Sequence, residues 1–205
     1  MSAMKLGSII GGRVAAPVKT TIYGVAGVGK TTFAVGAPSP VFLPVEEGTN
    51  ALDVQRFPQP ESFKDVLDAI TELGTGEHKY KTLVIDTLDA LEPLIWAHVC
   101  EAGKKASIED FGYGKGYVAA LEQWRLFLSY LERLRAKRQM NVVLIAHAAV
   151  KKFQNPESAD YDRWELKLAG KGASGLVTEW SDALLFACHE VVAATDKSER
   201  TRGVS

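Results

Sequence analysis

The chain has 205 residues, and a composition of 46% hydrophobic and 24% charged residues is that of an ordinary soluble globular protein with room for one domain. The formal net charge of -1 excludes a global basic field, so any contact with DNA must come from a local patch. No apolar run is long enough to span a bilayer, and the chain start lacks the apolar core of a signal peptide. Cys100 and Cys188 stand in no metal-ligand spacing, which fits a reducing compartment. We therefore expect a cytoplasmic protein without membrane contact.

Strands alternate with helices along the chain. Apolar runs predict strands at residues 20–23, 41–45, 82–86, 141–146 and 182–187. Helical spacing predicts helices at residues 30–35, 62–73, 88–100 and 117–138, the last with a buried stripe of Val118, Leu121, Trp124, Leu128, Leu131 and Leu134. Pro44 indicates an edge position or a strand end. This order implies a parallel sheet covered on both faces, with ligands bound beyond the carboxyl ends of its strands.

The first predicted strand ends at a glycine-rich turn that fits the pattern GxxxxGK[ST] at every fixed position. Its glycines let backbone N–H groups curl around phosphates, and the following helix presents its positive end to the same oxygens. Lys30 would neutralise the β- and γ-phosphates, and the Thr31 hydroxyl would ligate Mg²⁺. The segment therefore predicts a site for ATP and Mg²⁺, made by Gly24, Val25, Ala26, Gly27, Val28, Gly29, Lys30, Thr31 and Thr32.

Acidic residues follow two other predicted strands. Asp86 ends an apolar strand, from which a carboxylate can hold Mg²⁺, although it could also cap the helix that begins beyond it. The next residue is Thr87, where AAA+ enzymes usually carry the acid that activates water, so the sequence disfavours that subclass. Glu46 and Glu47 supply a carboxylate at the end of the second strand, and the register favours Glu46; the alternative is that both are exposed turn acids.

Residues 42–46, followed by residues 51–53, resemble the RecA-like ATPases, whose catalytic glutamate ends the strand after the P-loop helix. In that family a polar residue at the end of the fourth strand senses the γ-phosphate. His147 holds that place here, unless it only makes a local hydrogen bond. Residues 170–187 look like the glycine-rich second loop, helix and last core strand of the family. The resemblance covers roughly residues 17–190.

This resemblance implies a three-layer α/β RecA-like P-loop core with a mostly parallel sheet, a single domain over residues 1–205 and a homo-oligomer. Within the family, the loop at residues 111–117 resembles the small phage ATPases that act in single-strand annealing or recombination. RecA-like cores carry further strands after the last one here, so we expect a C-terminus that is truncated. Candidates for a basic residue that reaches a neighbour's ATP are Lys171, Arg200 and Arg202.

The segment after the fourth predicted strand interleaves cations with aromatic rings, which suits single-stranded DNA because cations follow phosphates and rings stack on bases. The residues concerned are Lys151, Lys152, Phe153, Arg163, Trp164, Lys167 and Lys171. Four acids in the same stretch leave a net charge near +1, so the alternative is a mobile, solvated loop. The position of the segment in the RecA-like pattern favours DNA.

Taken with the resemblance, these residues predict a protein that binds and hydrolyses ATP and acts on single-stranded DNA in phage-type recombination or annealing. Lys30, Glu46 and His147 would be its catalytic residues, and Thr31 and Asp86 its Mg²⁺ ligands. One alternative is a P-loop kinase for a small molecule or nucleoside, which would need an arginine-rich lid. Another is a nucleotide-binding interaction module with little turnover. A GTPase is disfavoured because DxxG and NKxD motifs are absent.

Overall fold

A computed structural model describes residues 6–9, 11–12, 15–170, 172–190, 192–195 and 201–204. Its centre is a seven-stranded sheet in the order β3-β2-β4-β5-β1-β7, with β6 paired to β5. All strand pairs of the sheet are parallel except β5 with β6. The strands are β1 (Lys19–Gly24), β2 (Pro40–Pro44), β3 (Gln55–Arg56), β4 (Thr82–Asp86), β5 (Asn141–Phe153), β6 (Tyr161–Leu166) and β7 (Ala183–Ala187).

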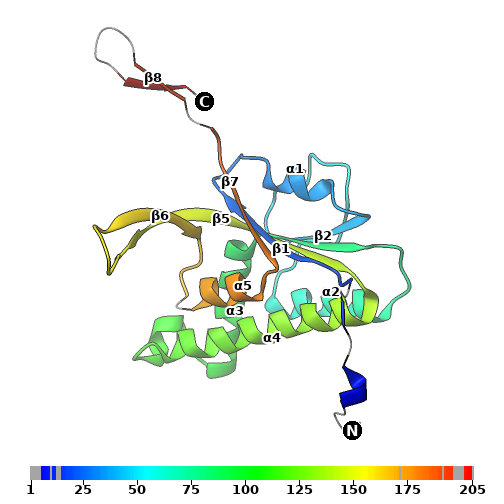
Figure 1. Cartoon of the computed structure of the whole chain (residues 1–205). Helices are drawn as coiled ribbons and strands as arrows, with labels where there is room; N and C mark the ends of the chain where they lie inside the picture. The colour runs from blue at the N-terminus through cyan, green and yellow to red at the C-terminus, as the bar shows by residue number, and fades with distance from the viewer. Residues whose placement is uncertain are drawn as a thin grey trace.

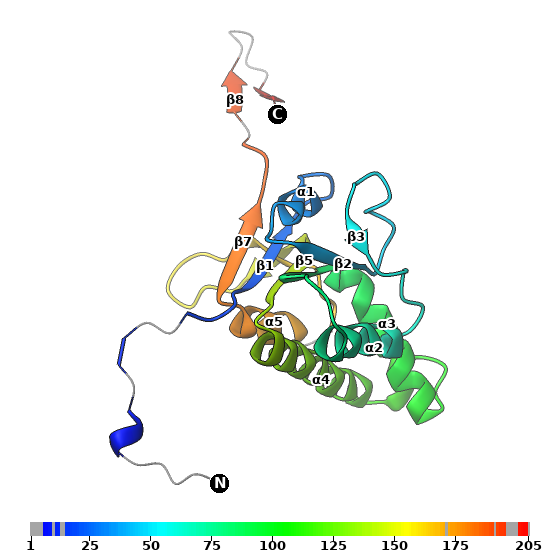
Figure 2. The ribbon, with the colours of Figure 1, turned by 90° about the vertical axis from the view of Figure 1, so that its right-hand side faces the viewer.

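Helices cover both faces of this sheet unequally (Figure 1). One face carries α1 (Lys30–Val35), and the other carries α2 (Phe63–Thr75), α3 (Leu88–Gly103), α4 (Lys115–Arg138) and α5 (Ala173–Trp180). Figure 2 shows the same division from the side. The predicted three-layer α/β core with a mostly parallel sheet is therefore confirmed. Two 3₁₀ turns, Leu6–Ser8 and Ile108–Phe111, and an antiparallel pair, β8 (Val192–Thr195) with β9 (Thr201–Val204), complete the described elements.

The two faces bury cores of different size. The larger core lies between the sheet and α2 to α5, and α4 contributes Trp124, Phe127 and Leu131 to it, each at most 1% exposed. The smaller core lies under α1 around Phe42 and Ile145. The prediction that Val118 is buried is wrong, since it is 62% exposed. Val118 precedes Trp124 by six residues. At about 100° per residue, this spacing places Val118 about 120° around the helix from Trp124.

The strands agree with the sequence expectation at Pro44 and differ from it in two other places. Pro44 is the last residue of β2, which lies between β3 and β4, so it marks a strand end and not an edge strand. Residues 148–153, expected to be a loop, continue β5 and pair with β6. The short strand β3 was not expected either. None of the described helices is both long and apolar enough to cross a membrane.

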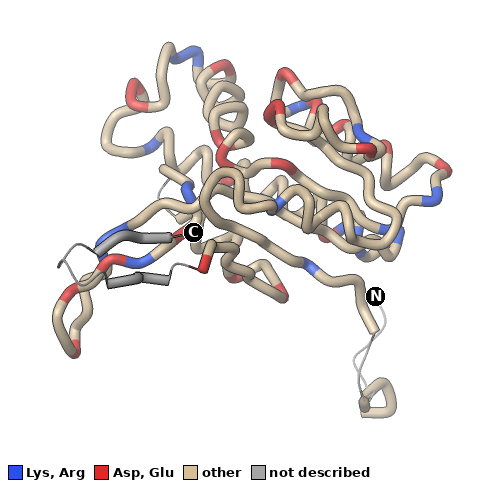
Figure 3. Tube along the Cα trace, turned by 90° about the horizontal axis from the view of Figure 1, so that it is seen from above, with Lys and Arg blue, Asp and Glu red and all other residues tan. Residues whose placement is uncertain are grey.

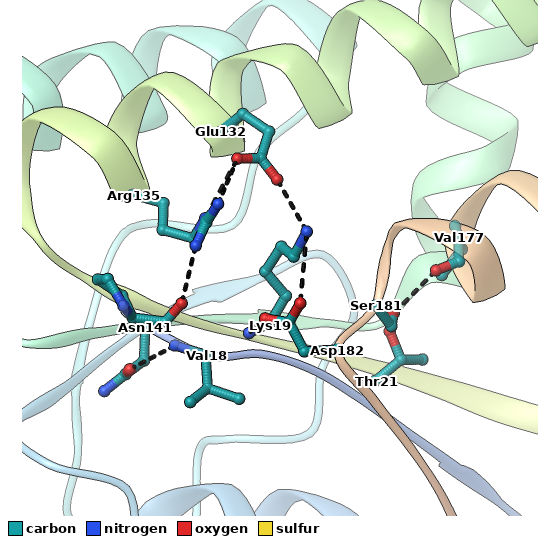
Figure 4. Close-up of polar contacts among 10 residues, drawn as sticks. Val18, Lys19, Thr21, Glu132, Arg135, Asn141, Val177, Ser181 and Asp182 are labelled. Atoms are coloured by element: carbon teal, nitrogen blue, oxygen red, sulfur yellow. Dashed lines mark hydrogen bonds and ion pairs between the residues drawn. The ribbon is translucent and has the colours of Figure 1, made fainter. Parts of the chain in front are cut away.

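The amino ends of the parallel strands are held together by a polar network (Figure 4). Lys19 Nζ lies 3.2 Å from Glu132 on α4 and 3.6 Å from Asp182 before β7. Arg135 donates to the same Glu132 carboxylate and, at 3.1 Å, to the Pro17 carbonyl. This network ties β1, β7 and α4 to one another at the end of the sheet that is opposite the glycine-rich turn.

Candidate nucleotide-binding site

The glycine-rich turn links the carboxyl end of β1 to the first residue of α1. Gly27 and Gly29 have φ values of 77° and 93°, in the left-handed region where any side chain is strained. A Cβ on Gly24 would lie 2.2 Å from the Ala187 carbonyl oxygen of β7. The three glycines are therefore required for separate reasons, two by backbone conformation and one by the close approach of the neighbouring strand.

Lys30 and Thr31, the first two residues of α1, contact different partners. Lys30 is 6% exposed, and its ammonium donates hydrogen bonds to the carbonyls of Gly24 and Val25, at 3.1 and 2.8 Å. Burial lowers the pKa of Lys30, against the pull of nearby carboxylates. The Thr31 hydroxyl donates to Asp86 Oδ2 at 2.8 Å. The two side chains predicted to ligate Mg²⁺, one on α1 and one at the end of β4, are thus in direct contact.

Asp86 and Glu46 are acids with raised pKa values. Burial raises the pKa of Asp86, and the hydrogen bond from Thr31 and the charge of Lys30 only partly offset it. Burial is also the main cause of the raised pKa of Glu46, which follows β2. Glu46 is half-buried and lines the same cavity as Asp86, whereas its neighbour Glu47 is exposed and does not. Of the two acids weighed from the sequence, Glu46 is the one that faces the glycine-rich turn.

His147 is held by an aspartate that the sequence analysis did not single out. Asp89, in the first turn of α3, accepts hydrogen bonds from the His147 backbone N–H at 2.9 Å and from its ring Nδ1 at 2.8 Å. Burial alone would raise the pKa of Asp89, but these hydrogen bonds hold it below its usual value. Because the carboxylate is ionised, Nδ1 must carry the proton, and the Nε2 atom is left for another partner.

These groups surround one cavity of about 310 Å³, beyond the carboxyl ends of the strands. Its walls include Gly27, Gly29, Lys30, Thr31, Thr32, Glu46, Asp86, Thr87 and His147. A buried lysine beside the backbone amides of a glycine-rich turn suits phosphate oxygens, and a hydroxyl beside a carboxylate offers the hard oxygen ligands that Mg²⁺ prefers. The donor set therefore fits a nucleoside triphosphate with Mg²⁺.

Five of the residues predicted to contact DNA lie on the hairpin formed by β5 and β6: Lys151, Lys152, Phe153, Arg163 and Trp164. Their charges are paired with acids of the same hairpin: Lys151 with Glu165 at 3.7 Å, Lys152 with Asp160 at 3.4 Å, and Arg163 with Glu165 at 2.6 Å. Rings are also in contact, since the Arg163 guanidinium lies 4.2 Å from the Phe153 ring centre and Trp164 stacks on Phe186. Lys167 is exposed just after β6. Figure 3 shows basic and acidic residues interspersed over the described chain.

The three candidates for a residue that reaches a neighbour's nucleotide stay predictions. Lys171, also a DNA candidate, and Arg200 lie outside the described residues. Arg202 lies in β9, and its side chain is not described.

Fold and cavity together define the class of protein. The glycine-rich turn follows β1, and Thr31 beyond it contacts Asp86, the acid that ends β4. The strand between β1 and β4 is β5, which carries His147. A second acid of the cavity, Glu46, follows β2. This is the arrangement of a P-loop nucleotide-binding domain with a RecA-like fold.

Comparison with known proteins gives the family. The chain belongs to the AAA domain family AAA_24, whose model matches residues 16–204. It is 31% identical over 137 residues to the SPbeta prophage-derived uncharacterized protein YorG of Bacillus subtilis (strain 168), and the match covers 63% of this chain. The chain spans about 40% of the length of that curated relative. Among solved structures, the RadB recombinase matches with a TM-score of 0.49 and 17% identity, over 83% of this chain and 74% of that chain.

The family description bears on one interpretation made from the sequence. Thr87 in place of an acid disfavours an AAA+ enzyme, yet the chain matches a family described as an AAA domain. The acid that lines the cavity in addition to Asp86 comes from β2 and not from the position after Asp86.

Proposed function

We propose that this protein binds and hydrolyses ATP with Mg²⁺, and that the nucleotide state controls the contact of the β5–β6 hairpin with single-stranded DNA in phage-type recombination or annealing. The observation that carries the proposal is the continuity of β5. His147 lines the nucleotide cavity, and the same strand runs on directly into the hairpin. The printed description of YorG as prophage-derived supports the phage setting.

The cavity residues would divide the chemistry as follows. Lys30 would neutralise charge on the β- and γ-phosphates, while Thr31 and Asp86 would hold Mg²⁺, which supplies further charge neutralisation when bound. Glu46 would orient the attacking water and accept its proton, because its raised pKa makes it a stronger base than an ordinary carboxylate. His147, with Nδ1 fixed by Asp89, would direct Nε2 to the γ-phosphate.

The hairpin would bind DNA by stacking more than by charge. Its cations are paired with acids, which weakens a purely electrostatic grip, whereas Trp164 is 43% exposed and Phe153 lies beside Arg163. Aromatic stacking on bases contributes about 1–3 kcal/mol per base and depends little on salt. We therefore expect modest affinity with a shallow salt dependence.

Assembly and location belong to the same proposal. Leu184, Leu185 and Phe186 are each between 37% and 41% exposed on β7, which ends the main sheet. An apolar strand at a sheet edge favours pairing with another copy, so these residues support a homo-oligomer. We keep the cytoplasm as the expected location.

ATP turnover with and without single-stranded DNA tests both halves of the proposal. We expect DNA to stimulate hydrolysis, and Glu46→Gln to lower kcat by about 100-fold or more while nucleotide affinity stays within about threefold. Glu47→Gln is the matched control, because that adjacent acid is exposed and should leave turnover unchanged.

Three results would contradict parts of the proposal. Equal kcat for wild type and Glu46→Gln would remove the catalytic role of Glu46. A rate that does not respond to DNA, together with no gel shift at low salt, would leave only an ATPase. Transfer of phosphate to a nucleoside, in place of release of free phosphate, would favour the kinase alternative.

A further inference from the structure

Glu92 is a buried acid that lies outside the nucleotide cavity. It is 4% exposed on α3 and occupies the apolar stripe that Leu88, Leu91 and Ile95 form on the same helix. A carboxylate in such a place is costly unless hydrogen bonds satisfy its oxygens. Its two oxygens accept hydrogen bonds from consecutive backbone amides, Ala169 N–H at 2.7 Å and Gly170 N–H at 2.9 Å.

The loop that contains these amides is shaped around the carboxylate. A Cβ built on Gly170 would lie 2.9 Å from Glu92 Oε1, which is closer than a side chain normally approaches. Residues 169–170 connect the end of β6 to α5. Glu92 therefore fixes the point at which the chain leaves the β5–β6 hairpin.

The other end of the hairpin is fixed from the same helix. Asp89 lies three residues before Glu92, and residues at that spacing share one face of a helix. Asp89 holds the backbone N–H of His147, where β5 enters the hairpin. The two ends are also joined directly, because the Lys167 N–H donates to the His147 carbonyl at 2.9 Å. Two acids of α3 thus hold the entry and the exit of one hairpin.

Helix α3 begins two residues after Asp86, the acid in contact with Thr31. A shift of its first turns relative to the P-loop would therefore be passed to both ends of the hairpin. With Asp89 alone, the hairpin could pivot about His147; with Glu92 as well, helix and hairpin base move as one body.

We propose that Glu92 is a positioning residue that couples the nucleotide cavity to the β5–β6 hairpin, by clamping the backbone amides of Ala169 and Gly170 to the helix that follows Asp86. The inference rests on the proposed function, because it assumes that nucleotide binds in the cavity. Glu92 does not line that cavity, so its removal should leave nucleotide binding intact while the hairpin stops responding.

The fluorescence of Trp164, on β6, reports on the hairpin because its ring stacks on Phe186 of β7 at 5.8 Å between centroids. The experiment titrates a non-hydrolysable ATP analogue with Mg²⁺, and subtraction of the Trp164→Phe signal isolates this residue. In wild type we expect a nucleotide-dependent change in Trp164 emission. In Glu92→Gln the amide group can accept only one of the two hydrogen bonds. We expect the emission change to fall about fivefold or more while analogue affinity stays within about twofold.

The matched control is Glu101→Gln, an exposed acid on the same helix, which should respond as wild type does. Gly170→Ala attacks the same contact from the loop and leaves α3 unchanged, so it replaces Glu92→Gln if that variant does not fold. Amide exchange at residues 169 and 170 provides a second measurement, and we expect it to be about tenfold faster in Glu92→Gln.

The outcomes separate this inference from the function on which it rests. A full Trp164 response in Glu92→Gln and Gly170→Ala would overturn the coupling role. So would a wild type that binds the analogue without any change at Trp164, although ATP binding would then stand. Failure of the wild type to bind the analogue at all would overturn the proposed function itself, and the inference with it.

Discussion

The two ends of β1 both gather charged side chains, but they satisfy those charges differently. At the amino end, Lys19 lies between Glu132 and Asp182, and Arg135 also pairs with Glu132. At the carboxyl end, the acids Asp86 and Glu46 line a cavity with Lys30 and His147. One end is a closed set of ion pairs, and the other is an open arrangement of acids and one buried ammonium.

The pKa values show the same contrast. Burial alone would raise the pKa of Glu132, but hydrogen bonds and charges from Arg135 and Lys19 hold it below its usual value. Burial raises the pKa of Asp86 and lowers that of Lys30, since their partners do not compensate fully. The charged forms are thus stabilised at the amino end and strained at the carboxyl end. Groups left in this state are typical of a site that awaits a charged ligand.

The largest predicted effects come from replacing Lys30 or Lys19, each in a separate variant, by alanine. Lys30→Ala removes the charge that faces the phosphates, so we expect ATP turnover to fall by about 100-fold or more. Its melting temperature should stay within about 3 °C of wild type, because the buried ammonium gives up little stabilisation. Lys19→Ala should do the reverse, with a loss of about 1–2 kcal/mol in unfolding free energy and normal turnover of the folded protein.

Calorimetry and a phosphate-release assay on both variants measure these effects. If Lys30→Ala unfolded early and Lys19→Ala lost turnover, the assignment of one end to stability and the other to ligand binding would be reversed.

A second prediction concerns the sign of a stability change at Asp86. A carboxyl whose pKa is higher in the folded chain contributes full stability below its unfolded pKa, near 3.8, and loses it as the pH rises through the folded value. At neutral pH, well above the unfolded pKa, the raised pKa of Asp86 therefore counts against folding when no ligand is bound. We expect Asp86→Asn to raise the melting temperature of the free protein by about 2–5 °C.

With ATP and Mg²⁺ bound, the wild type should have a higher melting temperature than Asp86→Asn. At 100 times its dissociation constant, a ligand adds about 2.7 kcal/mol to the stability of the wild type. Asp86→Asn should lose most of the gain that depends on Mg²⁺. Thermal melts with nucleotide in Mg²⁺ and in EDTA give the comparison. A free Asp86→Asn protein that melts below wild type would refute the idea of a strained carboxylate.

The sequence predicted the cavity better than the hairpin, for a physical reason. Parallel strands place their carboxyl ends at one edge, so residues that end apolar runs, such as Glu46, Asp86 and His147, could be grouped from their positions alone. The hairpin extends beyond the main sheet, and the apolar residues of β5 give way there to Lys151 and Lys152. Its pairing depends on contacts between strands, which a local pattern does not contain.

Asp89 and Glu92 were missed because each has an ordinary explanation on a helix. Asp89 is an acid in the first turn, where it suits the helix dipole. Glu92 offered a signal, since it stands in the apolar stripe between Leu91 and Ile95, where a charge must find a buried partner. That signal predicts burial but not the partner, because residues 169–170 are distant in the sequence.

The smallest predicted effect sharpens the comparison at the amino end of β1. A carboxyl whose pKa is depressed by folding, such as Glu132, contributes stability above its unfolded pKa of 4.5 and loses it as the pH falls through the folded value. Its side chain is 36% exposed, so solvent screening reduces the effect, and we expect Glu132→Gln to cost about 0.5–1 kcal/mol at pH 7.

Urea titrations of wild type and Glu132→Gln between pH 7 and pH 3 measure this difference. It should be constant near neutrality and decrease as the pH falls below the unfolded value of 4.5, where the wild-type carboxyl begins to take up its proton. The exposed Glu122→Gln, on the same helix, is the matched control and should show no such trend. A difference that persisted undiminished at pH 3 would mean that Glu132 acts through packing and not through its charge. The ion pairs would then not distinguish the amino end of β1 from the cavity at its carboxyl end.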